Sequence, residues 1–313
     1  MERKAKSEKR KAADAFGLLC FSLFVFQFSL LGCGPKNPQT KRQPYYGPTE
    51  TLGEVVAAVN ANNSKLPTLW AHIARNGLEA SFVDDRGKRQ DVVLGGTVLY
   101  RAPQDVLVVG HHDLGGNVLQ VGSNDERYWF GINVGDNKTT WWGRYQFLGA
   151  PCADPVPIRP DLILAVLGVS TINTDLTALP APVMRFNPDE DAYMLVWNGR
   201  LPDRWVATKE VWYDRQTKRP KFVLLFDENG RVLLRAFLSE HKPVQVPGTP
   251  QAQWPTVATR YELYFPENNG RLRLALDDVR LSRGAAPSDA TFNFNRAIAG
   301  VTKVIQLDRN CGQ

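Results

Sequence analysis

The chain has 313 residues, 43% of them hydrophobic and 22% charged, which is long enough for one large or two small domains. Its formal net charge is +6, but residues 1–32 hold six Lys/Arg and three Asp/Glu, so the remainder carries 32 basic and 29 acidic residues, a net charge of +3. That balance, with no basic cluster in the body of the chain, argues against a nucleic-acid-binding protein.

Residues 1–32 have the three-part layout of a secretory signal sequence. Lys and Arg dominate the first 14 residues, and a mostly apolar run follows. The run ends in Leu30-Leu31-Gly32-Cys33, which resembles the bacterial lipobox: an apolar pair, a small residue, and then the cysteine that is acylated. The resemblance implies cleavage before Cys33, a covalent diacylglycerol and acyl lipid on that cysteine, and a membrane partner reached through this lipid.

Two other interpretations of this region stay open. The apolar run approaches the length of a membrane-spanning helix and could be an uncleaved anchor, or Cys33 could follow an ordinary signal. All three interpretations place the rest of the chain outside the cytoplasm. Gly34, where an Asp would favour inner-membrane retention in proteobacteria, favours the outer membrane, facing the periplasm. Residues 33–48 are rich in Pro, Gly and Lys and predict a flexible tether.

Residues 49–61 predict an amphipathic helix, capped by Thr49 or Thr51, with Leu52, Val55, Val56 and Val59 on one face. Strands separated by Gly-, Asn- and Asp-rich turns follow, one of them a turn at Asn76-Gly77. A short buried helix is predicted over 161–169. The predicted strands are 69–75, 78–83, 91–101, 105–112, 117–122, 127–134, 140–147, 181–187, 191–198, 204–214, 219–226, 231–239, 256–265 and 270–281.

The later strands alternate between apolar and charged residues, as in an antiparallel sheet with one covered face. Val232, Leu234, Ala236 and Leu238 share a face, for example, opposite Arg231 and Arg235. Because two small helices cannot cover so wide a sheet, we expect it to curl and to leave its inner face incompletely filled. Such a face can form a cavity for an apolar ligand.

The candidates for lining this groove are large side chains within the predicted strands. They are Trp129, Trp142, Trp197, Leu234, Leu263 and Leu274. The alternative for each tryptophan is that it simply fills a core. Neighbouring residues on a strand point to opposite faces, so only one of Trp141 and Trp142 can face a cavity.

Four cysteines occur in the chain. Cys20 lies in the predicted signal and Cys33 is the predicted lipid site, which leaves Cys152 and Cys311. In an oxidising compartment these two are a candidate disulfide. The alternative is two free thiols, because sequence does not give their separation in space.

The order helix, strands, short helix, strands resembles the periplasmic lipoprotein carriers and outer-membrane lipoprotein receptors of the Lol system and related lipid-binding lipoproteins. The stretches that carry the resemblance are TETLGEVVAAVNANNSKLPTLWAHI, VVLGGTVLYRAPQDVLVVGHHDLGGNVLQVGSNDERYWF and, as a closing strand, ATFNFN. It covers most of residues 49–300 and rests on layout; the polar latch of the carriers has no counterpart. It implies an unclosed β-barrel wrapped around helices that holds acyl chains.

Signals for catalysis are weak. The chain has no Gly-x-Ser-x-Gly, His-Glu-x-x-His, Cys-x-x-Cys or Gly-rich phosphate loop. The adjacent residues His111 and His112 point to opposite faces of a strand, so they are poorly placed to share a metal. We therefore expect no enzyme, no metal site and no cofactor besides the lipid on Cys33.

These observations predict an α+β, mainly β fold: a curved antiparallel sheet, forming an unclosed barrel, around one or two helices. Residues 1–32 are the predicted signal, 33–48 the tether, and 49–313 a single domain. The expected function is binding of lipid or of lipoprotein acyl chains in a groove, with a possible role in transport across the envelope. The alternative is a protein-interaction or sensing module on the same fold. No oligomeric state is predicted.

Overall fold

The computed structural model describes residues 48–312 except 84–86, 113–114, 135–136, 157 and 283–285. All of them belong to the compact unit Tyr45–Gln313. The signal predicted for 1–32, the lipid site Cys33 and the tether as far as residue 47 lie outside the described residues.

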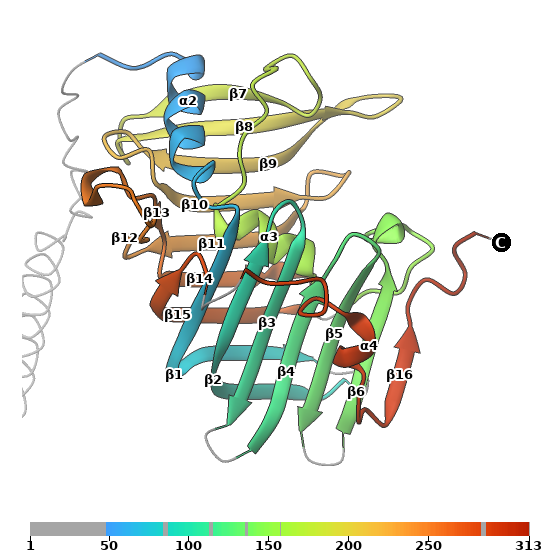
Figure 1. Cartoon of the computed structure of the whole chain (residues 1–313). Coiled ribbons are helices and arrows are strands. Elements are labelled where there is room, and N and C mark those ends of the chain that lie inside the picture. The colour runs from blue at the N-terminus through green and yellow to red at the C-terminus, as the bar shows by residue number, and fades with distance from the viewer. Residues whose placement is uncertain are drawn as a thin grey trace, which may run out of the picture. The chain divides into compact units, whose positions relative to one another are not determined.

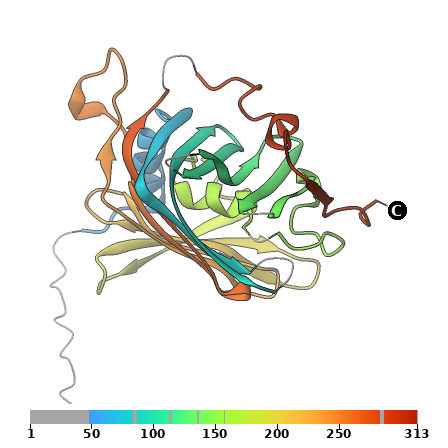
Figure 2. The same ribbon diagram turned by 90° about the horizontal axis from the view of Figure 1, so that it is seen from below.

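One sheet of 14 strands makes up most of this unit, in the order β16-β6-β5-β4-β3-β2-β1-β15-β14-β11-β10-β9-β8-β7. Neighbouring strands are antiparallel from β6 to β7, and β16 adds to β6 in parallel. The sheet curls around helix α3 and its edge strands β16 and β7 do not meet (Figures 1 and 2). The predicted curved, unclosed sheet is confirmed.

The strands before α3 are β1 (Thr68–Val83), β2 (Arg89–Arg101), β3 (Asp105–His112), β4 (Gly115–Ser123), β5 (Arg127–Val134) and β6 (Asn137–Arg144). Those after it are β7 (Ala181–Asn187), β8 (Ala192–Arg200), β9 (Trp205–Asp214), β10 (Pro220–Phe226), β11 (Val232–Ser239), β14 (Arg260–Phe265), β15 (Gly270–Arg280) and β16 (Lys303–Gln306). β12 (Lys242–Pro243) and β13 (Thr256–Val257) pair as a separate short ribbon. The strand predicted over 256–265 is therefore divided between β13 and β14.

The turn predicted at Asn76-Gly77 is wrong, because β1 runs through it. Residues 74–77 form a bulge: Ile73 pairs with Leu276 and Leu78 pairs with Leu274, so four residues of β1 face one residue of β15. Asn76 has a φ of 58°, which suits an asparagine in a bulge as well as in a turn. A bulge of this kind bends the strand that carries it.

Helix α2 (Leu52–Asn63) begins after Thr51. Thr51 and Glu54 form a capping box: the Glu54 amide donates to the Thr51 hydroxyl and the Thr51 amide donates to the Glu54 carboxylate, 2.7 Å apart. The apolar face of the helix is buried through Val55, Val56 and Val59. Of the two predicted caps, Thr51 is the one used.

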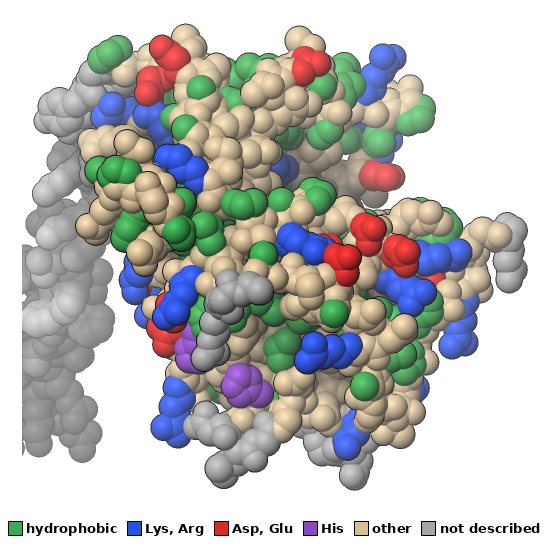
Figure 3. All heavy atoms as spheres, viewed as in Figure 1, with side chains coloured by type: hydrophobic (Ala, Val, Ile, Leu, Met, Phe, Trp, Pro, Cys, Tyr) green, Lys and Arg blue, Asp and Glu red, His purple; other side chains and the backbone are tan. Residues whose placement is uncertain are grey.

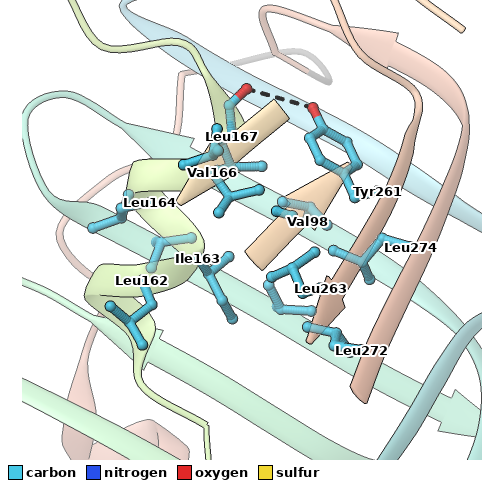
Figure 4. Close-up of a cluster of buried hydrophobic side chains, with 14 of the residues drawn as sticks. Val98, Leu162, Ile163, Leu164, Val166, Leu167, Tyr261, Leu263, Leu272 and Leu274 are labelled. Carbon is cyan, nitrogen blue, oxygen red and sulfur yellow. Dashed lines mark hydrogen bonds between the residues drawn. The ribbon is translucent and has the colours of Figure 1, made fainter. Parts of the chain in front are cut away.

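Helix α3 (Pro160–Leu167) lies inside the curve of the sheet (Figure 2). Pro160 occupies its first turn, and Gly168, with a φ of 71°, ends it. Figure 4 shows Ile163, Val166 and Leu167 facing side chains of β14 and β15, with the Tyr261 hydroxyl donating to the Leu167 carbonyl at 3.5 Å. One short helix thus fills the centre of the concave face.

The first part of the C-terminal segment (residues 286–312) covers the outer face of β3 to β6, and its later part joins the edge of the sheet. The segment includes α4 (Phe294–Ala297) and the edge strand β16. Phe292 and Phe294 join Leu107 and Trp129 in an outer aromatic cluster that is separate from the main core. The closing strand expected from ATFNFN is therefore wrong: this stretch is a turn leading into α4 and covers the sheet from outside.

Cys152 and Cys311 form a disulfide that spans 159 positions of the sequence. It ties the end of the C-terminal segment to the loop before α3. Asp308 lies beside it and is buried; its carboxylate accepts hydrogen bonds from the Arg144 amide at 2.9 Å and the Arg144 guanidinium at 2.7 Å. Burial raises the pKa of Asp308, but these hydrogen bonds outweigh it and the net direction is down.

Candidate functional site

A cavity of about 410 Å³ lies on the concave face between the C-terminal end of α3 and strands β8, β9 and β10. We call it the α3–β9 cavity. Its volume falls within the range of small-ligand sites, about 300–1,000 Å³. Its walls are Ala165, Gly168, Ser170, Thr171, Ile172, Asn173, Ala178, Leu179, Pro180, Trp197, Thr208, Lys209, Val211, Tyr213, Pro220 and Val223.

The end of α3 sets one wall of the cavity. A Cβ added to Gly168 would lie 2.9 Å from Pro220 Cγ, so the glycine allows the helix terminus to touch β10. Its left-handed φ then turns the chain back across the sheet. The residues that follow, 168–180, pass over the cavity, and we call them the strap.

Two asparagines of α2 hold the strap. Asn63, which is buried, donates from Nδ2 to the carbonyls of Gly168 at 3.0 Å and Ser170 at 2.7 Å. Asn60 donates to the Ile172 carbonyl at 2.8 Å and accepts from the Ile172 amide at 2.7 Å. The polar face of α2 therefore replaces the regular backbone pairing that the strap lacks.

The cavity reaches the surface beside the end of the strap. Leu179 lines it and is 51% exposed. An apolar ligand could enter there without passing through the core.

The sheet side of the cavity is mostly apolar, and Thr208 and Lys209 are its polar members. Trp197, Val211, Tyr213 and Val223 are buried, and burial raises the pKa of the Tyr213 hydroxyl above its ordinary value. Lys209 is half-buried among them, and its Nζ lies 4.2 Å from the centre of the Trp197 ring. Burial lowers the pKa of Lys209.

The predicted groove residues divide between the two faces of the sheet. Trp197 is buried in the main core and lines the cavity. Leu234, Leu263 and Leu274 are also buried on the concave face but belong to the filled core and do not line the cavity.

Trp129 and Trp142 do not face the concave side at all. They pack in and against the outer aromatic cluster, where Trp129 lies 5.9 Å and Trp142 lies 5.1 Å from the ring of Phe294. Trp141 is the inward member of its pair and is buried in the main core. The alternation was correctly expected, but the face was assigned wrongly because the outer side also has an aromatic cover.

Sequence reasoning missed Lys209 and the strap. Lys209 shares its strand face with Val211 and Tyr213, so a charged side chain at an inward position was visible in the alternation of β9. The apolar residues of the strap recur with neither helical nor strand spacing. Its sequence does not indicate the hydrogen bonds that it forms with α2.

A larger hollow of about 570 Å³ lies between the residues that follow β2 and the C-terminal segment. It is polar. Arg101 donates to the Asp105 carboxylate at 2.7 Å and pairs with Asp289 at 2.7 Å. Figure 3 shows acidic and basic side chains interleaved across this face. Because these charges already compensate one another, the hollow is a poor site for an apolar ligand.

Within the described ranges, no group of three or more His, Cys, Asp or Glu is placed to hold a metal ion. His111 and His112 occupy the end of β3. No helix among the described residues is long and apolar enough to span a membrane.

No family model and no curated protein matches the chain. Among solved structures, it is similar to a LolA superfamily protein from Nitrosomonas europaea, with 12% identity and a TM-score of 0.43 over 79% of this chain and 99% of that one. It is also similar to a putative outer membrane lipoprotein-sorting protein domain from Vibrio parahaemolyticus, with 12% identity and a TM-score of 0.43 over 78% of this chain and 97% of that one. A third similar structure is a DUF1329 family protein from Desulfovibrio piger, with 12% identity and a TM-score of 0.48 over 78% of this chain and 96% of that one.

Proposed function

We propose that this protein binds an acyl chain of a lipid or lipoprotein in the α3–β9 cavity, as part of lipid or lipoprotein handling at the cell envelope. The observation that carries the proposal is the cavity itself. It holds about 410 Å³ on the concave face of an unclosed sheet, has Trp197, Val211 and Val223 as its floor, and reaches the surface beside Leu179. Burying apolar surface in such a site supplies the driving force, about 0.8 kcal/mol for each CH₂ group removed from water.

Native mass spectrometry of residues 45–313 tests this proposal, because that unit contains the whole core described above. We expect copurified lipid and binding of a fluorescent fatty acid. Ala165→Trp, on the cavity side of α3, should fill the site and abolish both signals. Ala58→Trp, at an exposed position of α2, is the matched control and should retain them. Absence of lipid and of probe binding in the unsubstituted protein would contradict the proposal.

We further propose that the protein is held to the envelope by lipid on Cys33, at the outer membrane facing the periplasm. The support is the apolar run that ends in Leu30-Leu31-Gly32-Cys33. Cys33→Ser should release the protein from membranes or block its maturation, measured by fractionation and by the mass of the product. A mutant that stays with the membrane at the mature size would show that the anchor lies elsewhere.

A second candidate function is protein interaction on the same fold. It is favoured by β7, which ends the sheet and carries Val183, 53% exposed. An edge strand can accept an extended peptide as an added strand. Pull-down from envelope extracts of the unsubstituted protein and of Val183→Pro separates the two: a stable partner lost in the variant, with no lipid in the cavity, would favour interaction over lipid binding.

A further inference from the structure

The position of Lys209 in the sheet is unusual for a lysine. On the concave face, Lys209 of β9 pairs laterally with Trp197 of β8 and with Leu225 of β10, and Leu225 pairs in turn with Leu234 of β11. The row across four strands is therefore Trp, Lys, Leu, Leu, with the ammonium between apolar neighbours. A lysine normally reaches the surface with its charged end, and this one points into the α3–β9 cavity.

The charge of Lys209 has no anionic counterpart among the described residues. Within the part of the chain that the structure describes, the interaction of its ammonium is with the face of Trp197, 4.2 Å from the ring centre. Desolvation by burial lowers the pKa of Lys209. Two cations at the other end of β9 and β10 differ from it: Arg215 pairs with Asp191 at 2.6 Å and Lys221 with Glu190 at 3.1 Å. Removing part of a charge from water without an anionic partner is costly, so a half-buried lysine at this position calls for an explanation.

We infer that Lys209 binds the carboxylate of a single-chain fatty acid whose hydrocarbon tail occupies the α3–β9 cavity. The inference rests on the proposed function and names the class of ligand. One cation matches one negative charge, and the Trp197 ring covers the other side of the ammonium. The cavity volume, about 410 Å³, lies near the lower end of ligand sites and favours one chain over two. The ligand carboxylate would be the counter-ion of Lys209, held through a charge-assisted hydrogen bond.

The test compares charged and neutral ligands of equal chain length. Residues 45–313 are titrated with a fluorescent polyene fatty acid and, separately, with its methyl ester. Lys209→Met should weaken binding of the acid by about tenfold or more, as loss of a charge-assisted hydrogen bond predicts, and leave the ester unchanged. Lys209→Arg should retain the acid, and Lys242→Met, which removes an exposed lysine of β12, should change neither affinity.

The outcomes separate this inference from the proposed function. If the unsubstituted protein binds neither acid nor ester, the cavity is not a lipid site and both fail. If it binds both and Lys209→Met changes neither, acyl binding stands and the carboxylate site is overturned. Loss of both ligands in Lys209→Met would assign Lys209 a structural role instead. Displacement of the probe by an anionic diacyl phospholipid but not by a free fatty acid would overturn the single-chain assignment.

Discussion

At the scale of single residues, several polar groups buried in the fold are compensated by hydrogen bonds from other residues. Asp308 is buried but accepts hydrogen bonds from Arg144 and, at 2.8 Å, from the Gln306 side chain. Asn63 is buried but donates to two backbone carbonyls. Lys209 and His241 depart from this pattern, and each departure has a measurable consequence.

Lys209→Met should make the ligand-free protein more stable, by about 1 kcal/mol, because methionine fits the apolar row and removes an uncompensated charge. Urea unfolding of residues 45–313 measures the difference. With a saturating fatty acid the order should reverse, since only the lysine protein gains the full binding energy of the acid. A variant that is less stable than the parent in both conditions would mean that Lys209 supports the fold.

His241 should make stability depend on pH. Burial, and next the charge of Arg219, lower its pKa below the usual 6.5, while a hydrogen bond with the backbone of Pro220 partly offsets this. The unfolded chain then takes up a proton more readily than the folded one. The free energy of unfolding is therefore not reduced by His241 above the ordinary histidine pKa. It declines as pH falls below that value toward the lower pKa of the folded state.

Unfolding free energies measured from about pH 7 to pH 5, across the ordinary histidine range, should therefore decline less steeply in His241→Gln than in the parent. His112→Gln, which changes an exposed histidine at the end of β3, serves as the control and should follow the parent. An identical slope in all three proteins would remove His241 as the cause.

At the scale of elements, short pieces without regular pairing are positioned by helices. The strap takes its hydrogen bonds from α2, and α3 takes its direction from Pro160 and Gly168. On the outer face, a Cβ added to Gly122 of β4 would lie 2.4 Å from the Trp129 ring. The glycine thus makes room for the tryptophan to lie flat across β4, where the outer aromatic cluster covers it.

Asn63→Ala should loosen the strap. It removes both hydrogen bonds from Asn63 to the strap, and with them the one that Asn63 accepts from Asn62. The carbonyls of Gly168 and Ser170 lose these donors, at a cost of about 1–3 kcal/mol. Hydrogen exchange should become faster in residues 168–180, and the fatty-acid probe should dissociate faster. Asn133→Ala, which removes one exposed hydrogen bond to the Asn117 carbonyl, should change neither rate. Unchanged exchange in the strap of Asn63→Ala would mean that Asn60 alone suffices to hold it.

At the scale of the whole unit, sequence patterns predict the sheet well because each strand carries its own alternation. They predict poorly which segments pack on each face of the sheet, because those segments are far away in the sequence. The pair Trp141 and Trp142 shows the limit: alternation separates the two rings, but only the placement of Phe294 outside the sheet decides which ring faces the core. β16 and the strap escape prediction for the same reason, since each gains its hydrogen bonds from residues far away in the sequence.

The two halves of the sheet therefore have different covers. Strands β3 to β6 are covered from outside by the C-terminal segment, which Phe292, the Asp308 hydrogen bonds and the Cys152–Cys311 disulfide hold in place. The α3–β9 cavity lies against β8 to β10, and none of its lining residues belongs to that segment. Stability of the first half and ligand binding in the second should respond separately to a change in the disulfide.

Replacing Cys152 and Cys311 by serine tests whether stability and ligand binding respond separately. The unfolding free energy should fall by about 2–4 kcal/mol, because the crosslink no longer limits the unfolded chain, and Trp129 and Trp142 fluorescence should shift as their cover loosens. Affinity for the fatty-acid probe should stay within about twofold under conditions where the protein remains folded, since a change of that size is below about 0.5 kcal/mol. A parallel loss of probe binding would instead show that the outer cover and the cavity are energetically coupled across the sheet.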